Sequence, residues 1–441
     1  MGFEKFIRNS VSIRLLIIAI LILIMMIPSA MINSLIDERE NRKNEAIGEI
    51  TSKWANAQTV GGPVITVPYE EIVTTVEGKK QTVTDYIQFL PDFLEINGTI
   101  NPQIRHRGIY KAILYSSKIN LSGYFSFTKL DGLNISPQQI KWSNAFITVL
   151  ISDMHGIKDV IPLNWNKESL LLEPGIKSGN NIFSSGVSLK LPLSKASLTQ
   201  RAFPFALQLN LNGSEDLSFL PLGRKTVVQL TSPWTDPSFD GAFLPESYHI
   251  GKKAFSATWR ILDLNRNYPQ QWVGEINKDD IFNSKFGVQL FSPVTEYTKT
   301  TRAIKYLFMF VGLTFLVFFL VEVFNKKRIH PIQYLLIGLS LCIFYVLLLS
   351  ISEHLQFEFA YLIASLAITG LIAFYVKSTL GSNILTIIAA ILLIILYGFL
   401  YVLLQNQDYA LLLGSIGTFI IMAVVMYLSR KVDWYKIELN S

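Results

Sequence analysis

The ionisable side chains best placed for proton chemistry lie at the ends of apolar runs in the last third of the chain. Glu322 closes one such run, and Glu353 with His354 closes the next. Ionisable groups in or near hydrocarbon are costly to bury and are often functional, and an acid beside an imidazole fits proton sensing or gating. These three residues are therefore candidates for coupling or gating. The alternatives are that Glu322 pairs with the bases at 326–328, and that Glu353 and His354 are ordinary loop residues.

Two turn-rich segments are candidate recognition loops. Asp153 and His155 lie in ISDMHGIKD, and Trp234, Phe239 and Phe243 lie in TSPWTDPSFDGAFLP. Loops on a rigid scaffold often carry binding residues, and exposed aromatic side chains make recognition surfaces. The alternatives are a hairpin turn in which Asp153 bonds nearby backbone amides, and a rigid loop that its aromatic residues pin to the core.

No catalytic or metal-binding signature accompanies these residues. His106, His155 and His249 are far apart and lack a neighbour at the short spacing of a zinc site. The sequence contains no nucleophile elbow, Walker loop or zinc-protease motif. We therefore expect a protein that is not an enzyme, with no catalytic residues and no metal or cofactor. An enzyme acting on glycan or peptidoglycan stays open, because carboxylates distant in sequence can meet in a fold.

The composition is that of a membrane protein. The chain has 441 residues, 50% hydrophobic and 16% charged, with a formal net charge of +6 and one cysteine. Soluble domains carry about 25% charged residues, so these values argue against a single water-soluble globule. The apolar content also excludes a disordered chain, and a single cysteine forms no internal disulfide.

Six apolar runs are long enough to cross a bilayer core of about 30 Å as helices. The first exceeds the apolar region of a cleaved signal peptide, so we interpret it as an uncleaved signal anchor. The predicted order is 1–10 cytoplasmic N-terminus, 11–32 signal anchor, 33–60 stalk helix, 61–302 β-rich periplasmic domain, transmembrane helices at 303–324, 331–352, 357–376, 383–404 and 410–428, and 429–441 cytoplasmic tail.

The distribution of Lys and Arg predicts the orientation. These residues occur before and within the start of the first run, at 326–328, at Lys377 and in the C-terminal tail, whereas the loops 353–358 and 405–409 contain none. The positive-inside rule then places both termini in the cytoplasm and residues 33–302 in the periplasm. The net positive charge therefore reflects topology, and we expect no nucleic-acid partner.

The long extracytoplasmic segment carries strand signals. Runs rich in β-branched and aromatic residues, bounded by Gly, Pro, Asn or Asp, are typical of strands. Examples are VITVPY, TVTDYIQFL, GIYKAILYSSKINLSGYFSF, AFITVLIS, GVSLKLPL, FALQLNLNG, TVVQLTS, AFSATWRIL and FGVQLFSP. We predict an α-helical membrane protein with six transmembrane helices and a sandwich-like, antiparallel β-rich domain inserted between helices 1 and 2.

The order of several motifs resembles a known family. They are GGPVITVPY at 61–69, LEPG at 172–175, LNGSEDLSFLPLGR at 211–224, RIHPIQYLLIGLSLCIFYVLLLSISEH at 328–354 and VDWY at 432–435. This set is similar to the CreD family of bacterial inner-membrane proteins. The resemblance implies a Gram-negative inner-membrane protein linked to the Cre two-component regulatory system, to envelope integrity, and to tolerance of colicins or cell-wall stress. It supplies no catalytic residues.

Three functions are consistent with these features. The first is a non-catalytic envelope protein whose periplasmic β domain binds an envelope component or partner, with the lipid bilayer, envelope proteins or peptidoglycan as partners. The second is a transporter or channel with a periplasmic substrate-capture domain. The third is a periplasmic enzyme acting on glycan or peptidoglycan. The sequence leaves the oligomeric state open.

Overall fold

The computed structural model divides the chain into two compact units. We call Met1–Asn44 with Val294–Ser441 the helical unit, and Glu45–Pro293 the β unit. The structure describes residues 11–74, 80–127, 135–136, 138–177, 179, 182–191, 193–194, 202–290, 296–325, 329–406 and 409–430.

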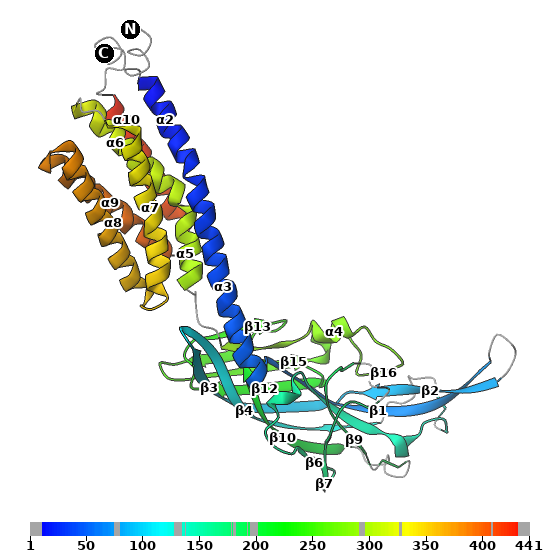
Figure 1. Cartoon of the computed structure of the whole chain (residues 1–441). Helices are drawn as coiled ribbons and strands as arrows, with labels where there is room; N and C mark the ends of the chain where they lie inside the picture. The colour runs from blue at the N-terminus through cyan, green and yellow to red at the C-terminus, as the bar shows by residue number, and fades with distance from the viewer. Residues whose placement is uncertain are drawn as a thin grey trace. The chain divides into compact units, whose positions relative to one another are not determined.

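The helical unit consists of α-helices (Figure 1). They are α2 (Val11–Ile24), the first part of α3 (Met26–Trp54), α5 (Glu296–Lys305), α6 (Leu307–Asn325), α7 (Pro331–Ser352), α8 (Phe357–Leu380), α9 (Asn383–Gln405) and α10 (Ala410–Ser429). Most of them are apolar, whereas α5 is short and polar.

Within the described residues, five helical segments are long and apolar enough to cross a membrane. They are Ile13–Trp54, Pro331–Ser352, Phe357–Thr379, Asn383–Gln405 and Ala410–Tyr427. A further candidate is a bent pair, Glu296–Lys305 with Leu307–Val323, whose two helices meet at 46°. The six apolar runs of the sequence therefore all fall in helices, and the second of them includes this bend.

Local sequence explains where these helices begin and end. At the start of α7, His330 accepts a hydrogen bond from the Ile332 amide, and Pro331 occupies the first helical position, where no amide hydrogen is needed. Helix α8 ends at Gly381, whose φ of +61° is favoured by glycine. The hydroxyl of the next residue, Ser382, then caps α9.

The β unit consists of two sheets of nine and eight strands. The first sheet contains β1 (Gln58–Thr74), β2 (Lys80–Phe89), β5 (Phe146–Ile151), β8 (Glu173–Pro174), β9 (Gly186–Lys190), β11 (Asp216–Phe219), β13 (Pro237–Gly241), β16 (Gln271–Val273) and β17 (Phe286–Leu290). The second contains β3 (Phe93–Arg107), β4 (Tyr110–Phe125), β6 (Pro162–Trp165), β7 (Glu168–Leu171), β10 (Phe203–Ser214), β12 (Lys225–Ser232), β14 (Ser247–Ile250) and β15 (Phe255–Leu262).

Short helices lie between strands of the β unit, namely η2 (Trp142–Asn144), η3 (Met154–Gly156), η5 (Asp263–Asn265) and α4 (Lys278–Phe282).

Both sheets are mixed, which corrects the predicted antiparallel arrangement. β1 pairs in parallel with β11, and β3 pairs in parallel with β12. Parallel neighbours need a long crossover connection, and here the connection from β1 to β11 contains most of the unit. The order of the first sheet, β13-β17-β11-β1-β5-β9-β8, places β1 near its centre.

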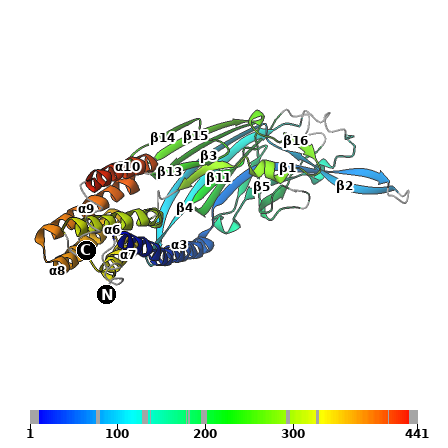
Figure 2. The same cartoon turned by 90° about the horizontal axis from the view of Figure 1, so that it is seen from above.

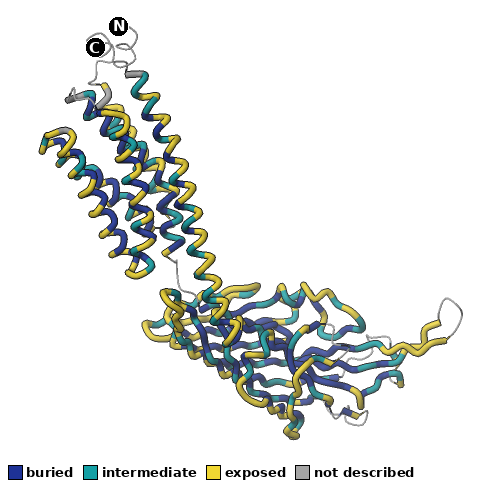
Figure 3. Tube along the Cα trace, in the orientation of Figure 1, coloured by how far each residue is buried: buried dark blue, intermediate teal, exposed yellow. Residues whose placement is uncertain are grey.

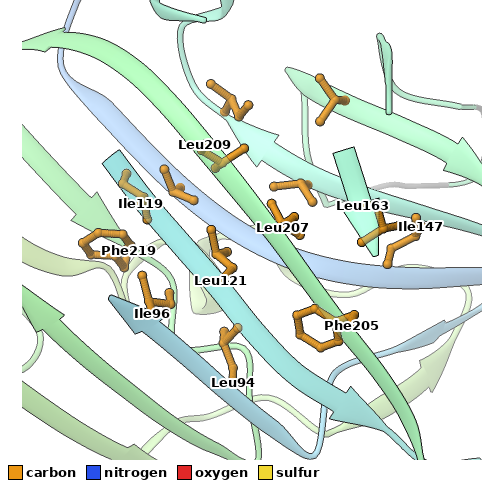
Figure 4. Close-up of a cluster of buried hydrophobic side chains, with 14 of the residues drawn as sticks. Leu94, Ile96, Ile119, Leu121, Ile147, Leu163, Phe205, Leu207, Leu209 and Phe219 are labelled. Carbon is orange, nitrogen blue, oxygen red and sulfur yellow. The ribbon is translucent and has the colours of Figure 1, made fainter. Parts of the chain in front are cut away.

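The two sheets share one hydrophobic core, as expected for a sandwich. Side chains from β3, β4 and β10 meet side chains from β5 and β11, all of them buried (Figure 4). A second cluster, which includes Val64, Leu150 and Trp272, covers the opposite face of the first sheet. Strand β5 and residues 60–67 of β1 are therefore buried on both faces, which explains their nearly continuous apolar sequences.

The predicted stalk helix 33–60 is shorter in the structure. Helix α3 ends at Trp54, and β1 begins at Gln58. The Gly61-Gly62-Pro63 segment lies inside β1, where the pairing with β5 shifts register between Gly61 and Val64. This irregularity accommodates the φ of +107° at Gly62.

Candidate functional site

Asp153 joins two segments of the β unit. Its Oδ2 accepts hydrogen bonds of 2.9 Å from both the backbone and side-chain nitrogens of Asn56, and its Oδ1 accepts from the His155 amide at 3.0 Å. Partial burial acts to raise the pKa of this carboxyl, but the hydrogen bonds from Asn56 and His155 outweigh it and hold the pKa below its usual value. The Asp153 carboxylate thus fixes the entry to β1 against the end of β5.

His155 projects from this junction into solvent. Its Nδ1 lies 2.9 Å from Asp153 Oδ1, while 81% of its side chain is exposed. The main chain of the same loop is fixed by Gln58, whose Nε2 donates to the Asp153 carbonyl at 2.8 Å. The loop therefore has the local hydrogen bonding of a structural turn, with one imidazole presented outward.

The aromatic residues of the second predicted loop pack against the core. The ring of Phe239 contacts Trp259 and Phe255, and the Phe243 carbonyl accepts a 3.1 Å hydrogen bond from Trp259 Nε1. Trp234 is half-buried, and its Nε1 donates to the Asp236 carbonyl at 3.0 Å. Little of this aromatic surface is left for a partner.

A surface that the sequence reasoning did not single out is the outer part of the β1–β2 ribbon, which we call the arm and define as residues 70–74 and 80–84. These strands pair in register from Glu70 with Thr84 to Thr74 with Lys80. They extend beyond the other strands (Figures 1 and 2), and nearly all of their residues are exposed (Figure 3). In the sequence, this ribbon is indicated by two runs of β-branched residues on either side of the glycine in EGKKQ.

The arm exposes aliphatic side chains on both faces. Ile72 is 65% exposed, and Val73 and Val83 are also exposed. Successive residues of a strand point to opposite faces, so Ile72 and Val73 face in opposite directions. Isolated two-stranded ribbons are marginally stable in water, which makes the arm a candidate for contact with a partner.

A polar cavity of about 220 Å³ lies elsewhere in the β unit, between Asp92 and Gln270. Arg224 joins two carboxylates here, with Nε 3.0 Å from Asp92 Oδ1 and Nη1 3.4 Å from Asp263 Oδ2. The Ser126 hydroxyl donates to the other oxygen of Asp92 at 2.6 Å. One guanidinium thus pairs with both carboxylates, an arrangement that favours binding or structure over acid–base catalysis.

Glu322 is buried in the helical unit, with 4% of its side chain exposed. Its Oε1 lies 2.9 Å from Arg14 Nη1, and its Oε2 accepts a 3.1 Å hydrogen bond from the Tyr334 hydroxyl. The bases at 326–328, its predicted partners, lie outside the described residues. Within the described part of the chain, Glu322 links α6 to α2 and α7.

Glu353 and His354 belong to the other end of α7. Glu353 accepts a 2.9 Å hydrogen bond from Tyr297 and lies 3.7 Å from Arg39 Nη1, whereas His354 is exposed. Tyr334 and Glu353 are separated along the helix by about 28 Å at 1.5 Å per residue. The structure therefore does not bring Glu322 and Glu353 into one site.

Metal binding has no support in the described part of the chain, where no group of three or more His, Cys, Asp or Glu side chains could hold an ion.

Comparison with known proteins identifies the family. The protein-family model described as "Inner membrane protein CreD" matches residues 10–435 of this chain. The chain belongs to the CreD family. Inner membrane protein CreD of Escherichia coli (strain K12) is 32% identical over 421 residues, which cover 95% of this chain and 92% of the relative. CreD membership and the apolar helices together make this a multi-pass inner-membrane protein.

Among solved structures, an M1 zinc metallopeptidase from Deinococcus radiodurans matches 39% of each chain at 11% identity. Its TM-score is 0.19, a value at which the similarity carries no argument about the fold or the activity of this CreD-family chain.

Proposed function

We propose that this CreD-family protein is a non-catalytic component of the inner membrane that supports envelope integrity and tolerance of stress or colicins. In this proposal both termini are cytoplasmic and the β unit is periplasmic, where it binds an envelope component or a partner protein. Family membership supports the process, and the distribution of Lys and Arg supports the orientation.

The observation that carries the binding role is the arm. Its exposed aliphatic side chains, Ile72, Val73 and Val83, lie on a ribbon whose two faces lack the cover that the rest of β1 and β2 receives. Exposed strands and apolar patches of this kind are common protein-interaction elements. A transporter is less well supported, because Glu322 and Glu353 are separate and each contacts an arginine.

The test is complementation of a deletion strain. We expect the deletion to increase sensitivity to detergent, cell-wall antibiotics or colicins, and the wild-type chain to restore resistance. The double variant Ile72→Ser/Val83→Ser should reach the membrane in normal amount and fail to restore it. Leu264→Ser is the matched control, because Leu264 is an exposed aliphatic residue of η5 outside the arm.

Two results would count against the proposal. A deletion strain with unchanged envelope morphology and unchanged sensitivity would remove the envelope role. Full complementation by the Ile72→Ser/Val83→Ser variant would remove the arm as the binding element.

A further inference from the structure

The helical unit contains a cavity between α8 and α9. Its volume is about 370 Å³, within the range of roughly 300–1,000 Å³ typical of small-molecule sites. It follows one face of α8 from Glu358 to Thr369, which is about 16 Å at 1.5 Å per residue. Its remaining lining residues are Tyr361, Leu362, Ser365, Leu366, Ile394, Tyr397, Gly398 and Tyr401. The cavity is thus a long and narrow space parallel to two membrane-spanning helices.

One rim of this cavity faces the outside of the helical unit. Leu362, Leu366 and Ile394 line the cavity, and each is more than half exposed. In a membrane-spanning segment, exposed aliphatic side chains contact lipid tails and not water. The cavity is therefore open to the hydrocarbon of the bilayer, and the molecules available to enter it are membrane lipids.

The inner wall is made of polar aromatic residues. Tyr361 donates a 2.6 Å hydrogen bond to the Tyr397 carbonyl. Tyr397 is 3% exposed, and its hydroxyl has no hydrogen-bond partner among the described residues. A buried hydroxyl without a hydrogen-bond partner is unfavourable. Two helices that only packed against each other would be expected to place apolar side chains at this position.

Charged groups of both signs lie at one end of the cavity. Glu358 Oε1 is 3.3 Å from Lys299 Nζ and accepts a 3.3 Å hydrogen bond from Gln405 Nε2. Glu358 lies at the start of α8 and Gln405 at the end of α9, the positions at which a span leaves the hydrocarbon, and Lys299 belongs to the neighbouring helix α5. A phosphate beside Lys299 and an amine beside Glu358 would complement this end.

We propose that the α8–α9 cavity binds one membrane phospholipid, with an acyl chain along Leu362, Leu366 and Ile394 and the headgroup at Lys299 and Glu358. The length of the cavity suits an extended acyl chain, and the pair of opposite charges suits the headgroup of a phosphatidylethanolamine. This site shares no residue with the arm, so the lipid proposal and the proposed function are tested on different residues.

Gly398 permits a direct test. A side chain added at Gly398 meets open space, as does one added at Gly370, which lies on α8 but does not line the cavity. Gly398→Leu should therefore fill the cavity without disturbing the helices, and Gly370→Leu is the matched control. Equal melting temperatures of the two variants would establish that the fold is retained.

The measurement uses the full-length protein in vesicles of phosphatidylethanolamine and phosphatidylglycerol that contain a phosphatidylethanolamine with a photoreactive acyl chain. After irradiation, mass spectrometry should locate most label in residues 357–405. Gly398→Leu should reduce this label by about tenfold, as for a loss of about 1.4 kcal/mol in binding, and Gly370→Leu should leave it unchanged. Label spread evenly over all exposed helices, or retained in Gly398→Leu, would overturn the proposal.

A second variant tests the headgroup. Native mass spectrometry after partial delipidation should show retained phosphatidylethanolamine on the wild-type protein, and less on Lys299→Gln. Equal retention would overturn the assignment of the headgroup to Lys299.

Discussion

One ion pair of the helical unit joins residues that lie 308 positions apart in the sequence. Arg14 and Glu322 form a 2.9 Å ion pair, and Tyr334 donates to the second carboxylate oxygen. A buried acid with two partners in a membrane-spanning bundle links three helices, α2, α6 and α7. We therefore interpret Glu322 as a residue that orders the bundle.

Removal of the Glu322 charge should destabilise the protein. In Glu322→Gln, Arg14 would be left beside an uncharged amide, so we expect the free energy of unfolding to fall by about 3 kcal/mol. The loss should be somewhat smaller than for a fully buried pair, because Arg14 is partly exposed. Thermal unfolding in detergent measures this loss. The control is the double variant Arg14→Gln/Glu322→Gln, which should be less destabilised than the sum of the single variants. Strict additivity would contradict a direct pair.

Asp153 should make the β unit sensitive to acid. Its folded-state pKa lies below the usual value, so its stabilising contribution is present above the usual value and is lost as the pH falls through the lowered one. Asp153→Asn should lower the free energy of unfolding by about 1–3 kcal/mol at pH 7, and the difference from wild type should shrink toward pH 3.

Urea unfolding followed by tryptophan fluorescence measures this effect, because Trp142, Trp165, Trp259 and Trp272 all lie in the β unit. His155→Ala is the control. This variant loses the imidazole but keeps the backbone amide of residue 155, which donates to Asp153 Oδ1. An Asp153→Asn difference that does not change with pH would show that the carboxylate charge is unimportant.

At the same scale, sequence reasoning found Glu322 but not its partners. An acid within an apolar run is visible in the sequence, whereas Arg14 lies 308 residues away, and only packing brings the two together. For Asp153, the turn chemistry predicted bonds to nearby amides, and the His155 amide is one of them. The bonds from Asn56 depend on the pairing of β1 with β5 and have no local signal.

Among the elements, the strands with regular alternation were predictable, and the irregular ones were not. β4, β10 and β15 coincide with predicted segments, but β3 was missed because Gly98 and Pro102 interrupt its pattern. Pro102 is tolerated since β3 pairs with β12 only from Phe93 to Thr99, so the amide that proline lacks has no partner strand on that side. The parallel pairs were not predictable, because they depend on contacts across most of the unit.

A glycine in β4 is required by the close approach of a neighbouring backbone. A Cβ added at Gly123 would lie 2.0 Å from the Phe93 carbonyl oxygen, an atom that cannot move without breaking the β3–β4 pairing. We expect Gly123→Ala to lower the free energy of unfolding by about 2 kcal/mol or more.

The measurement is the urea midpoint by tryptophan fluorescence. Gly251→Ala is the matched control, because its nearest contact would be 3.4 Å, an ordinary packing distance. Equal midpoints for the two variants would mean that β3 and β4 separate more easily than the structure indicates.

For the whole molecule, the proposed topology has a direct test that uses its single cysteine. Cys342 is buried, with 3% exposure, and should not react with a maleimide that cannot cross membranes. Leu264→Cys, in the β unit, should be labelled on intact spheroplasts. Ser378→Cys, at the end of α8, should be labelled only after the membrane is permeabilised.

Labelling of both positions in intact spheroplasts, or of Ser378→Cys alone, would contradict the orientation predicted from the Lys and Arg residues. The wild-type protein with Cys342 provides the background.

The central position of β1 also has a consequence for synthesis. Gln58 in β1 pairs with Leu217 in β11, and Leu217 pairs with Val288 in β17. At ribosome speeds of roughly 5–20 residues per second, β1 is complete on the order of ten seconds or more before the last of these strands exists. A chain truncated just before β17 would contain β1 and β11 with one edge of β11 unpaired. Late truncations should therefore yield aggregation-prone protein that is degraded, and not a shortened protein with partial activity.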